Sequence, residues 1–413
     1  MAGITTSRLP PPAEGLERSE TGSSLVDEFS LVQGGPIYRF QTAIGMALPN
    51  REGVLKRALL TTLVTWFPLL ILSLIQGRAF GSQVNIPFLY DFAASIRFLI
   101  GLPLLVIAEA VIDPRLNNAV RHFVKSGIVA KEDLPAFEQV ILKVNRLRNA
   151  IFPGLAILAI AFAPSIFSKK ADLLRHGFSS WHTISSASGE SLSLAGWWFA
   201  LISVPLFRLL LLRWVWIIFL WTVFLRAVRR IHLGCVATHP DTCGGLGFLA
   251  EAQLLFGFIA FAGAAAVAGA LGNQIAYEGA TVSSVKFLMI TYCVLLTVLL
   301  AAPLLVLTPK LAELKRRGLH KYAGLGTAYV QSFDAKWIRH LSPEQEPLLG
   351  TADIQSLADL YNSYTVVREM KVVLIDKRVL IGLTIPSVLP FIPLVIIATP
   401  ADTLIHAVMK LLV

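Results

Sequence analysis

The fold is decided by residues 194–225, which read LAGWWFALISVPLFRLLLLRWVWIIFLWTVFL. Arg208 and Arg213 are the only charged residues among these 32. An α-helix of 32 residues is about 48 Å long, whereas the hydrocarbon core of a bilayer is ~30 Å thick. Because Pro205 only bends a helix and no turn signal follows Trp197, we predict one long helix that crosses a membrane and projects from it. Two shorter segments are the alternative.

Six further apolar segments are each long enough to cross a bilayer. They are Leu55–Gln76, Phe92–Ile112, Leu147–Phe167, Phe248–Leu271, Val285–Leu307 and Val379–Ala398. Of the 413 residues, 55% are apolar and 15% are charged, against about 25% charged in a soluble domain. Because the apolar residues are gathered in long runs, we predict an all-α, polytopic helical membrane protein with about seven transmembrane helices in a lipid bilayer.

The basic residues are spread unevenly around these segments, and the asymmetry predicts an orientation. With a cytosolic N-terminus, 26 Lys and Arg residues fall on the cytosolic side and five on the other. Only Lys169, Lys170 and Arg175 oppose this trend. Cytosolic loops carry such an excess, so we expect a cytosolic N-terminus and a periplasmic C-terminus. The same loops account for most of the net charge of +10, and no nucleic-acid partner is predicted.

Four regions follow from this topology. Residues 1–50 lack a compact apolar core, so we expect a disordered cytosolic tail without a signal peptide. Residues 51–307 are expected to form a membrane domain of six spans with an amphipathic cytosolic helix at 131–147. Residues 308–378 are expected to form a cytosolic helical loop, and residues 379–413 the seventh span and a short interfacial tail.

A second stretch, THPDTCGGLGFLAE at residues 238–251, lies at the expected cytosolic turn between the fourth and fifth spans. In the structural interpretation, Pro240 ends the preceding segment, Asp241 or Thr242 caps the next helix, and the glycines permit a sharp turn. The alternatives are an acid–base pair or ligand site at His239 and Asp241, a chaperone-recruiting loop, and a zinc site. The zinc ligands would come from His232, Cys235, His239, Asp241 and Cys243, but their spacing fits no standard motif, so no metal or cofactor is predicted.

HPDTCGGLGFL at 239–249, taken with LGTADIQSLADL at 349–360, resembles a family of multi-pass bacterial inner-membrane proteins from about residue 50 onward. The resemblance implies this helical fold and a bacterial inner-membrane location, and it implies no reaction. The matching positions are His239, Pro240, Asp241, Gly244, Gly245, Gly247 and Phe248 in the first motif and Asp353, Gln355 and Asp359 in the second. Since buried polar groups seek partners, we expect the two motifs to dock on each other and to frame any functional cleft.

Charged residues within the expected spans need partners. Arg97 and Glu109 belong to the second span, and Arg208 and Arg213 belong to the fourth. A charge at the centre of a bilayer costs at least ~2.5–3.5 kcal/mol on insertion scales. We therefore expect Glu109 to pair with Arg208 or Arg213, either as a structural ion pair or as part of a substrate or proton pathway.

The fifth and seventh spans carry packing signals. Small residues recur at every fourth position of the fifth span, at Ala260, Ala264, Ala268 and Gly272, which predicts close contact between helices. The seventh span contains Pro386, Pro390 and Pro393. It is therefore either a broken helix that lines a cavity or simply a bent span.

Two functions of different kinds fit this layout. One is channel-like transport of a small solute or ion, with a path near Glu109, Arg208, Arg213 and the interrupted seventh span. The other is a membrane-anchored scaffold or sensor that binds a cytosolic protein partner. An enzyme is disfavoured because no nucleophile motif accompanies the His-Pro-Asp turn, and a primary pump is disfavoured because no nucleotide-binding loop is present. Assembly into a homo-oligomer is left open.

Overall fold

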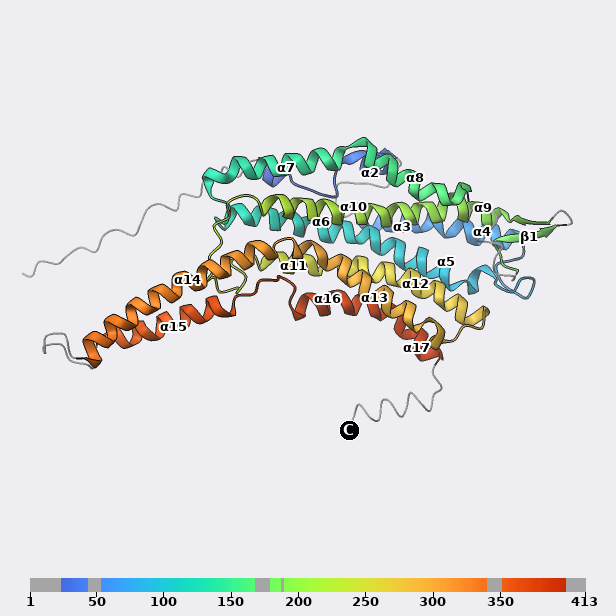
Figure 1. Ribbon diagram of the computed structural model, residues 1–413. Coiled ribbons are helices and arrows are strands. Elements are labelled where there is room, and N and C mark those ends of the chain that lie inside the picture. The colour runs from blue at the N-terminus through green and yellow to red at the C-terminus, as the bar shows by residue number, and fades with distance from the viewer. Residues whose placement is uncertain (1–23, 44–52, 168–178, 187–188, 340–350, 399–413) are drawn as a thin grey trace, which may run out of the picture.

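The computed structural model describes residues 24–43, 53–167, 179–186, 189–339 and 351–398. Within these residues the chain is almost entirely helical, and its one sheet is an antiparallel pair of strands, β1 (Thr183–Ser186) and β2 (Gly189–Leu192). The predicted all-α class is therefore confirmed. Most of the helices run side by side along one long axis, as Figure 1 shows.

Among the described residues, six helices or helix groups are apolar and long enough to cross a membrane. They are α3–α4 (Gly53–Thr65, Phe67–Ile75), α5–η2–α6 (Phe92–Ile96, Arg97–Gly101, Leu102–Lys125), α9–η4–α10 (Leu194–Trp198, Phe199–Ser203, Val204–Val228), α11–α12 (Phe248–Leu254, Gly257–Tyr277), α13 (Val282–Leu305) and α16–η6–α17 (Lys377–Val388, Leu389–Phe391, Ile392–Ala398). A multi-pass membrane architecture is thus present, with six spans or, if one bent pair is counted, seven.

The bent pair corresponds to the predicted third span. A short 3₁₀ turn, η3 (Lys131–Asp133), leads into α7 (Leu134–Asn149), and α8 (Ile151–Phe167) follows at an angle of 41°. The predicted span began at Leu147, but the helix breaks at Ala150, whose backbone is extended. Pro153 lies in the first turn of α8, where its missing N–H costs nothing, so the sequence favours a new helix start there.

Short polar residues begin several of these helices. The side chains of Asp91, Ser193, Thr281 and Asp376 each accept a hydrogen bond from a backbone amide in the first turn of α5, α9, α13 and α16, respectively. Such caps satisfy amides that have no partner within the helix. The chain therefore marks the start of four spans locally, before any tertiary contact.

A π-helical turn stands before a proline in two of the spans. η2 precedes Pro103 at the start of α6, and η4 precedes Pro205 at the start of α10. Each proline lacks the N–H that would bond four residues back, and the amide just before it donates to the carbonyl five residues earlier instead. Residues 194–228 therefore continue as one long helix, as predicted, with one widened turn.

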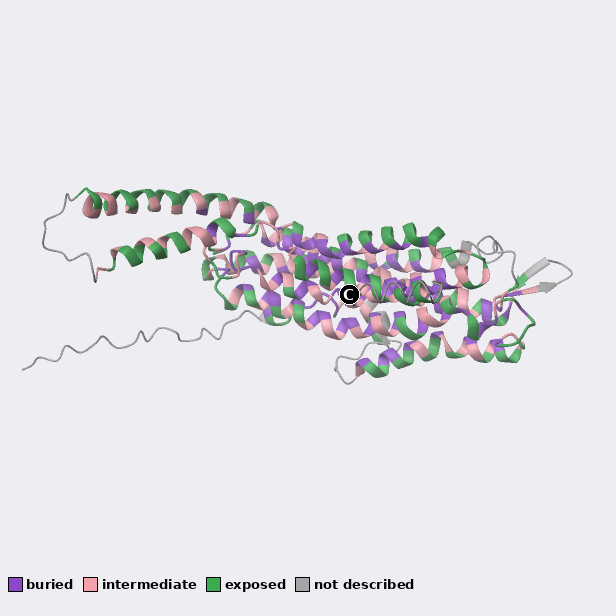
Figure 2. Cartoon of the chain, turned by 90° about the horizontal axis from the view of Figure 1, so that it is seen from below, coloured by how far each residue is buried: buried purple, intermediate pink, exposed green. Residues whose placement is uncertain are grey.

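The centre of the bundle is α10, which packs against α6, α7, α8 and α13. Trp214, Trp221 and Phe224 are almost completely buried. The ring of Phe224 lies 5.4 Å from that of Phe29 and 6.0 Å from that of Phe137, measured between centroids. Figure 2 shows the buried residues concentrated in the bundle, whereas the hairpin that projects from it is mostly exposed or half-buried. This aromatic packing fixes the C-terminal half of α10 against Phe29 and against Phe137 of α7.

The small-residue ridge of α12 packs as predicted. Ala260, Ala264, Ala268 and Gly272 are all buried. On the same helix, a Cβ at Gly269 would lie 2.8 Å from the carbonyl oxygen of Phe92, and one at Gly257 would lie 2.9 Å from that of Gly382. The absence of a side chain at these two glycines lets the backbones of α5 and α16 approach α12 closely.

Part of the predicted disordered tail is ordered. Residues 24–43 form α1 (Ser24–Asp27), α2 (Gly35–Ala43) and an extended connection between them, which we call the N-terminal strap. Val26, Phe29, Leu31 and Val32 of the strap are buried in the main core. The expectation for residues 1–50 is therefore wrong over this stretch, because these apolar side chains bury too much surface to remain in solvent. Residues 1–23 and 44–50 lie outside the described residues.

Two features mark the ends of the bundle (Figure 1). At one end α14 (Thr308–Phe333), its continuation η5 (Asp334–Ile338) and α15 (Asp353–Glu369) form a projecting hairpin, as expected for a helical loop at 308–378. The opposite end carries the β1–β2 pair and the 3₁₀ turn η1 (Phe88–Tyr90).

The seventh predicted span is broken into α16, η6 and α17 around its three prolines. The predicted interfacial tail at 399–413 lies outside the described residues.

Candidate functional site

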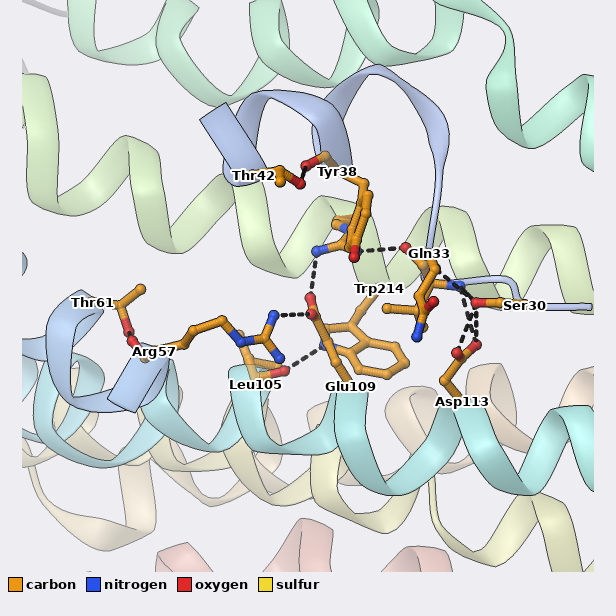
Figure 3. Close-up of polar contacts among 12 residues, drawn as sticks. Ser30, Gln33, Tyr38, Thr42, Arg57, Thr61, Leu105, Glu109, Asp113 and Trp214 are labelled. Carbon is orange, nitrogen blue, oxygen red and sulfur yellow. Dashed lines mark hydrogen bonds and ion pairs between the residues drawn. The ribbon is translucent and has the colours of Figure 1, made fainter. Parts of the chain in front are cut away.

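Three charged side chains from different spans meet in the core. Arg213 of α10 donates from Nη1 to Glu109 Oε1 of α6 at 2.5 Å, and Arg57 Nη1 of α3 lies 3.5 Å from Glu109 Oε2. All three are buried, with side chains at most 7% exposed. Figure 3 shows the contact between Arg57 and Glu109. The predicted pairing of Glu109 is therefore confirmed for Arg213. Arg57 lies near the start of the predicted span Leu55–Gln76 and is not among the predicted site residues.

The N-terminal strap closes over this ion network. Asp113, one helical turn after Glu109, accepts hydrogen bonds from Ser30 Oγ at 2.7 and 2.9 Å and from the amides of Leu31 and Val32 at 3.1 and 3.2 Å. Arg213 Nη2 donates to the carbonyl of Val32 at 2.8 Å. The strap is therefore held by buried charges on both α6 and α10, as Figure 3 shows. The role of Asp113 could not be predicted from the sequence, because its partners are more than 80 residues away.

The ion network is closed rather than open to solvent. The cavity beside Arg213, lined also by Leu31, Val32 and Arg148, has a volume of about 20 Å³, which is room for about one water molecule. Glu109 and Arg213 were predicted to lie near a transport path, and the geometry favours the structural alternative. Arg208 lines a separate cavity.

A larger cavity lies elsewhere in the bundle, between η2, α10, α12 and α13. Its volume is about 450 Å³, within the ~300–1,000 Å³ of ligand sites. Four polar side chains reach its wall, Arg97, Arg208, Gln274 and Tyr292, and the remaining lining residues are apolar or glycine. We call it the arginine cavity. Among the residues predicted as sites, Arg208 belongs to it.

The helix geometry places the two arginines on one cavity. Arg97 opens the π-helical turn η2, and Arg208 lies in the first turn of α10, just after Pro205. The Arg97 guanidinium carbon lies 5.8 Å from the ring centroid of Phe207, a cation–π distance. Arg97 also lies within electrostatic range of Arg208 and Asp91. Two like charges in one wall can together bind an anion.

A polar cluster around Asp91 closes the neighbouring end of the bundle. Asp91 Oδ2 accepts from Trp181 Nε1 at 2.9 Å, and Oδ1 accepts from Asn273 Nδ2 at 2.8 Å. His182, stacked on Trp181 at 3.7 Å, has Nε2 4.0 Å from Asp91 Oδ2. Burial lowers the pKa of His182 to about 4, although Asp91 acts in the opposite direction. His182 is therefore neutral at pH 7 and holds its loop by packing.

The His-Pro-Asp stretch forms a compact turn. Asp241 accepts hydrogen bonds from the amides of Cys243, Gly245 and Gly247 at 2.8 to 3.1 Å, and His239 Nδ1 lies 2.8 Å from Asp241 Oδ1. Partial burial raises the pKa of Asp241, but the three amides and His239 outweigh this and leave it below its usual value. Gly244 and Gly245 have φ of +67° and +94°. The predicted turn is thereby confirmed. The predicted cap is wrong, because the N-cap of α11 is Gly247, no side chain caps the helix, and Asp241 bonds the amide of Gly247 itself.

The turn docks on the base of the hairpin, not on the second motif. The amide of Lys371 donates to the Thr242 carbonyl at 2.7 Å, and a Cβ at Gly244 would lie 2.7 Å from Leu314. These contacts are near the end of α15, whereas Asp353 and Gln355 lie at its start, about 25 Å away along a helix of 17 residues. The predicted cleft between the two motifs is therefore wrong. Helix α15 separates them, since one motif begins it and the turn contacts its other end.

The second motif makes its own local contacts. Asp353 Oδ2 accepts from Lys336 Nζ and Trp337 Nε1, both at 2.9 Å, and Gln355 bonds Asp359 at 3.0 Å. The two bonds of Asp353 tie the start of α15 to η5, whereas the bond between Gln355 and Asp359 lies within α15. Asp353 thus stabilises the tip of the hairpin, and His239 finds its carboxylate within its own motif.

The chemistry of the turn differs from that of a zinc site. Across the described residues, no group of three or more His, Cys, Asp or Glu side chains is placed to hold a metal. Burial raises the pKa of Cys235 to about 11, and burial together with Asp241 raises that of Cys243. Metal binding and nucleophilic attack both need the thiolate, which these surroundings disfavour.

We expect Glu109→Gln to destabilise the folded protein by about 3–5 kcal/mol, because it leaves two buried arginines without their carboxylate. The measurement is unfolding of purified protein in detergent. Glu132→Gln, at a solvent-exposed position, is the matched control and should be neutral. The double variant Glu109→Gln with Arg213→Gln should recover part of the loss. Equal stability of wild type and Glu109→Gln would contradict a buried ion network.

The neutral His182 predicts a pH dependence. Because its pKa is lower in the folded state than its ordinary ~6.5, the unfolded chain binds the extra proton first, and stability is lost as pH falls from about 6.5 to 4. This residue contributes a slope of at most about 1.4 kcal/mol per pH unit. His182→Phe, which keeps the stacking, should flatten the fall measured from pH 7 to pH 4.5. An unchanged slope would show that His182 is exposed or already charged.

Comparison with family models, with curated proteins and with solved structures finds no match. The roles of the ion network, the arginine cavity and the His-Pro-Asp turn therefore follow from their geometry and chemistry alone.

Proposed function

We propose that this chain transports a small solute across the bacterial inner membrane and that the arginine cavity is its substrate site. The observation that carries the proposal is the pair Arg97 and Arg208, which share one cavity of about 450 Å³ among membrane-spanning helices. Charged residues within spans are expensive and mark substrate or ion pathways by default. Glu109 and Arg213 belong to the closed ion network, so the proposed substrate path runs through the arginine cavity and not past those two residues.

The location and orientation are part of the proposal. The distribution of basic residues supports a cytosolic N-terminus and a periplasmic C-terminus. The hairpin of α14 and α15 would then project into the cytosol, and the β1–β2 pair would face the periplasm. The two motifs that resemble a family of bacterial inner-membrane proteins support the same location.

Elements that could move lie beside the cavity. η2, which contributes Arg97, is a π-helical turn, and such turns occur often at functional sites. The three-part span α16–η6–α17 packs on α12, the helix that lines one wall of the cavity. Broken helices of this kind line substrate sites in transporters. A shift of α16 against α12 would open the cavity on one side or the other.

Cysteine accessibility tests the proposal. We expect a cysteine placed in the cavity by Ala270→Cys, with the three native cysteines replaced by alanine, to react with a membrane-impermeant sulfonate thiol reagent. Arg97→Gln with Arg208→Gln should slow the reaction about tenfold or more, because two positive charges no longer concentrate the anionic reagent. A cationic reagent should not be slowed. Oriented vesicles, checked by labelling Ala280→Cys and Ser356→Cys from opposite sides, show which face gives access.

The control is Val294→Cys on the outer face of α13, where the side chain is 56% exposed to the surroundings of the bundle. In a bilayer this position faces lipid and should stay unreactive from both sides. Reaction at Ala270→Cys no faster than at Val294→Cys would overturn the transport proposal.

A scaffold is the second candidate, and the hairpin favours it. A groove of about 590 Å³ runs between α14 and α15 and is almost wholly apolar. Tyr361 on its wall is 62% exposed. An amphipathic helix of a partner protein fits such a groove, with acidic residues toward the bundle, where Arg316, Arg317 and Lys321 are exposed.

A synthetic amphipathic helix with acidic residues at one end probes this second function. We expect it to bind the wild-type protein and to bind Tyr361→Glu at least tenfold more weakly, as measured by fluorescence anisotropy. Ser332→Glu, at an exposed position on α14 that does not line the groove, is the control. Equal affinity for all three proteins would remove the scaffold function at this groove.

A further inference from the structure

We infer that the chain pairs with a second copy of itself through the α14–α15 hairpin, so that two hairpins form a four-helix bundle beyond the membrane spans. The inference rests on the scaffold function proposed above, since it names the helices that occupy the groove of the hairpin. It is independent of the arginine cavity and of transport.

The groove on the hairpin is an apolar face at the surface. Its volume is about 590 Å³, and the residues that line it are apolar, tyrosine or glycine. Val330 and Ile354 on its wall are each 51% exposed. Figure 1 shows that α14 and α15 project beyond the bundle, and both lie outside the candidate spans, so lipid tails do not cover this face. A layer of two helices with one apolar face calls for a second layer against it.

Gly326 makes this face suited to close contact with other helices. It lines the groove, and a Cβ placed on it would meet no heavy atom within 4 Å. A glycine within an exposed helix is less favourable than an alanine, and the described residues hold no contact that requires one here. Ala323 and Ala358 on the same face are small and exposed. Small residues of this kind let another helix approach closely.

A second copy brings the same face to the groove. Copies in one bilayer share one orientation, so a two-fold axis along the membrane normal sets the two hairpins side by side. Each α14 then lies beside α15 of the other copy, as neighbouring helices do in an antiparallel four-helix bundle. The occupant of the groove is thus a face of the same length and the same apolar character.

The charges of the two helices favour this arrangement. α14 carries five Lys and Arg residues and one Glu, whereas α15 carries three Asp and Glu residues and one Arg. Pairing α14 with α15 of the second copy therefore sets a basic helix beside an acidic one. Two α14 helices side by side would instead repel each other.

Arg316 and Glu369 are positioned to pair across such an interface. Within one chain, a Cβ at Gly318 of α14 would lie 2.9 Å from Val367 of α15. Arg316 and Glu369 each lie two residues from this contact, about 200° around their helices, so both point away from it. Both are exposed and stand at the same height along the hairpin. The two-fold axis preserves that height, so Arg316 of each copy lies near Glu369 of the other.

The area of the face suits pairing within a membrane. α15 has 17 residues, about 25 Å, and two helices side by side are about 20 Å wide, which gives an outline of about 500 Å² per copy. Stable interfaces between soluble proteins bury about 800 Å² per partner. Copies held in one bilayer start at a high effective concentration, so a smaller interface suffices.

Energy transfer between labelled copies in vesicles tests the inference. Full-length protein carries a donor or an acceptor dye on Ser332→Cys, which is exposed on α14 and off the groove, with the three native cysteines replaced by alanine. We expect transfer that rises with the protein-to-lipid ratio and saturates, as in an equilibrium between monomer and dimer. Transfer no greater than that of randomly mixed monomers at every ratio would overturn the inference.

A matched pair of glycine variants locates the interface. Gly326→Glu should weaken pairing about tenfold or more, because it places a charge in the apolar contact. Gly324→Glu is the control and should leave pairing unchanged, since Gly324 is exposed and off the groove, and a Cβ there also meets nothing within 4 Å. Both changes replace glycine by a better helix former, so neither should unfold α14. Equal pairing of the two variants would show that the copies do not meet at the groove.

Charge reversal tests the arrangement of the second copy. Arg316→Glu should weaken pairing about threefold or more, and Arg316→Glu combined with Glu369→Arg in the same chain should restore it. A loss of structure in α14 could not be repaired by the second change on α15. A double variant that pairs no better than Arg316→Glu alone would contradict the two-fold arrangement.

This inference and the scaffold function fail separately. A wild type that stays monomeric but binds the synthetic helix in a Tyr361-dependent way keeps the scaffold and removes the second copy. Pairing that depends on Gly326, together with equal affinity of the synthetic helix for wild type and Tyr361→Glu, keeps the second copy and removes the external partner.

Discussion

The ion pair between Arg213 and Glu109 is the constraint on which the arrangement of the bundle depends. It joins α10, the central helix, to α6, and Arg57 brings α3 to the same carboxylate. A buried ion pair adds little net stability compared with apolar packing, but any arrangement that separates its members leaves a bare charge in the core. We interpret it as a register device. Three spans and the N-terminal strap fit together in the one alignment that satisfies two arginines, Glu109 and Asp113 together.

The same physics explains why the second pair of arginines looks different. Arg97 and Arg208 lie on a cavity of about 450 Å³, whereas the arginines of the ion network share a buried carboxylate in close packing. Proline contributes to this difference. Pro103 and Pro205 each impose a widened turn at the start of a long helix, and Arg97 and Arg208 are placed next to those turns. The contrast supports a structural role for Arg57 and Arg213, and Arg97 and Arg208 are the pair for which we propose a substrate site.

The two polar motifs both contact the α14–α15 hairpin, but at its opposite ends. The polar groups of the His-Pro-Asp turn bond one another: within nine residues, the Asp241 carboxylate accepts hydrogen bonds from three backbone amides and contacts the His239 imidazole. Its outward contacts, through Thr242 and Gly244, hold the base of the α14–α15 hairpin. Asp353 holds the tip. Both motifs therefore shape the hairpin, and any partner of that hairpin would meet a surface that they position.

The sequence by itself determined what depends on local chemistry and on the cost of desolvation. Long apolar runs dictate membrane-spanning helices, the small residues of α12 dictate close packing, and Asp241 with its glycines dictates a turn. A buried carboxylate such as Glu109 also demands a cation, so a pairing with Arg208 or Arg213 could be predicted. Only the tertiary structure chose between those two arginines, because the choice depends on rotation about α10 and on the Pro205 turn. It alone showed that the N-terminal strap is ordered, because the partners of its residues lie on distant helices. Ser30 bonds Asp113 of α6, and Phe29 packs against Phe224 of α10. It alone placed Arg97 and Arg208 on one cavity. That cavity lies between several helices, so it depends on how they pack together and cannot be predicted from the sequence of any one of them.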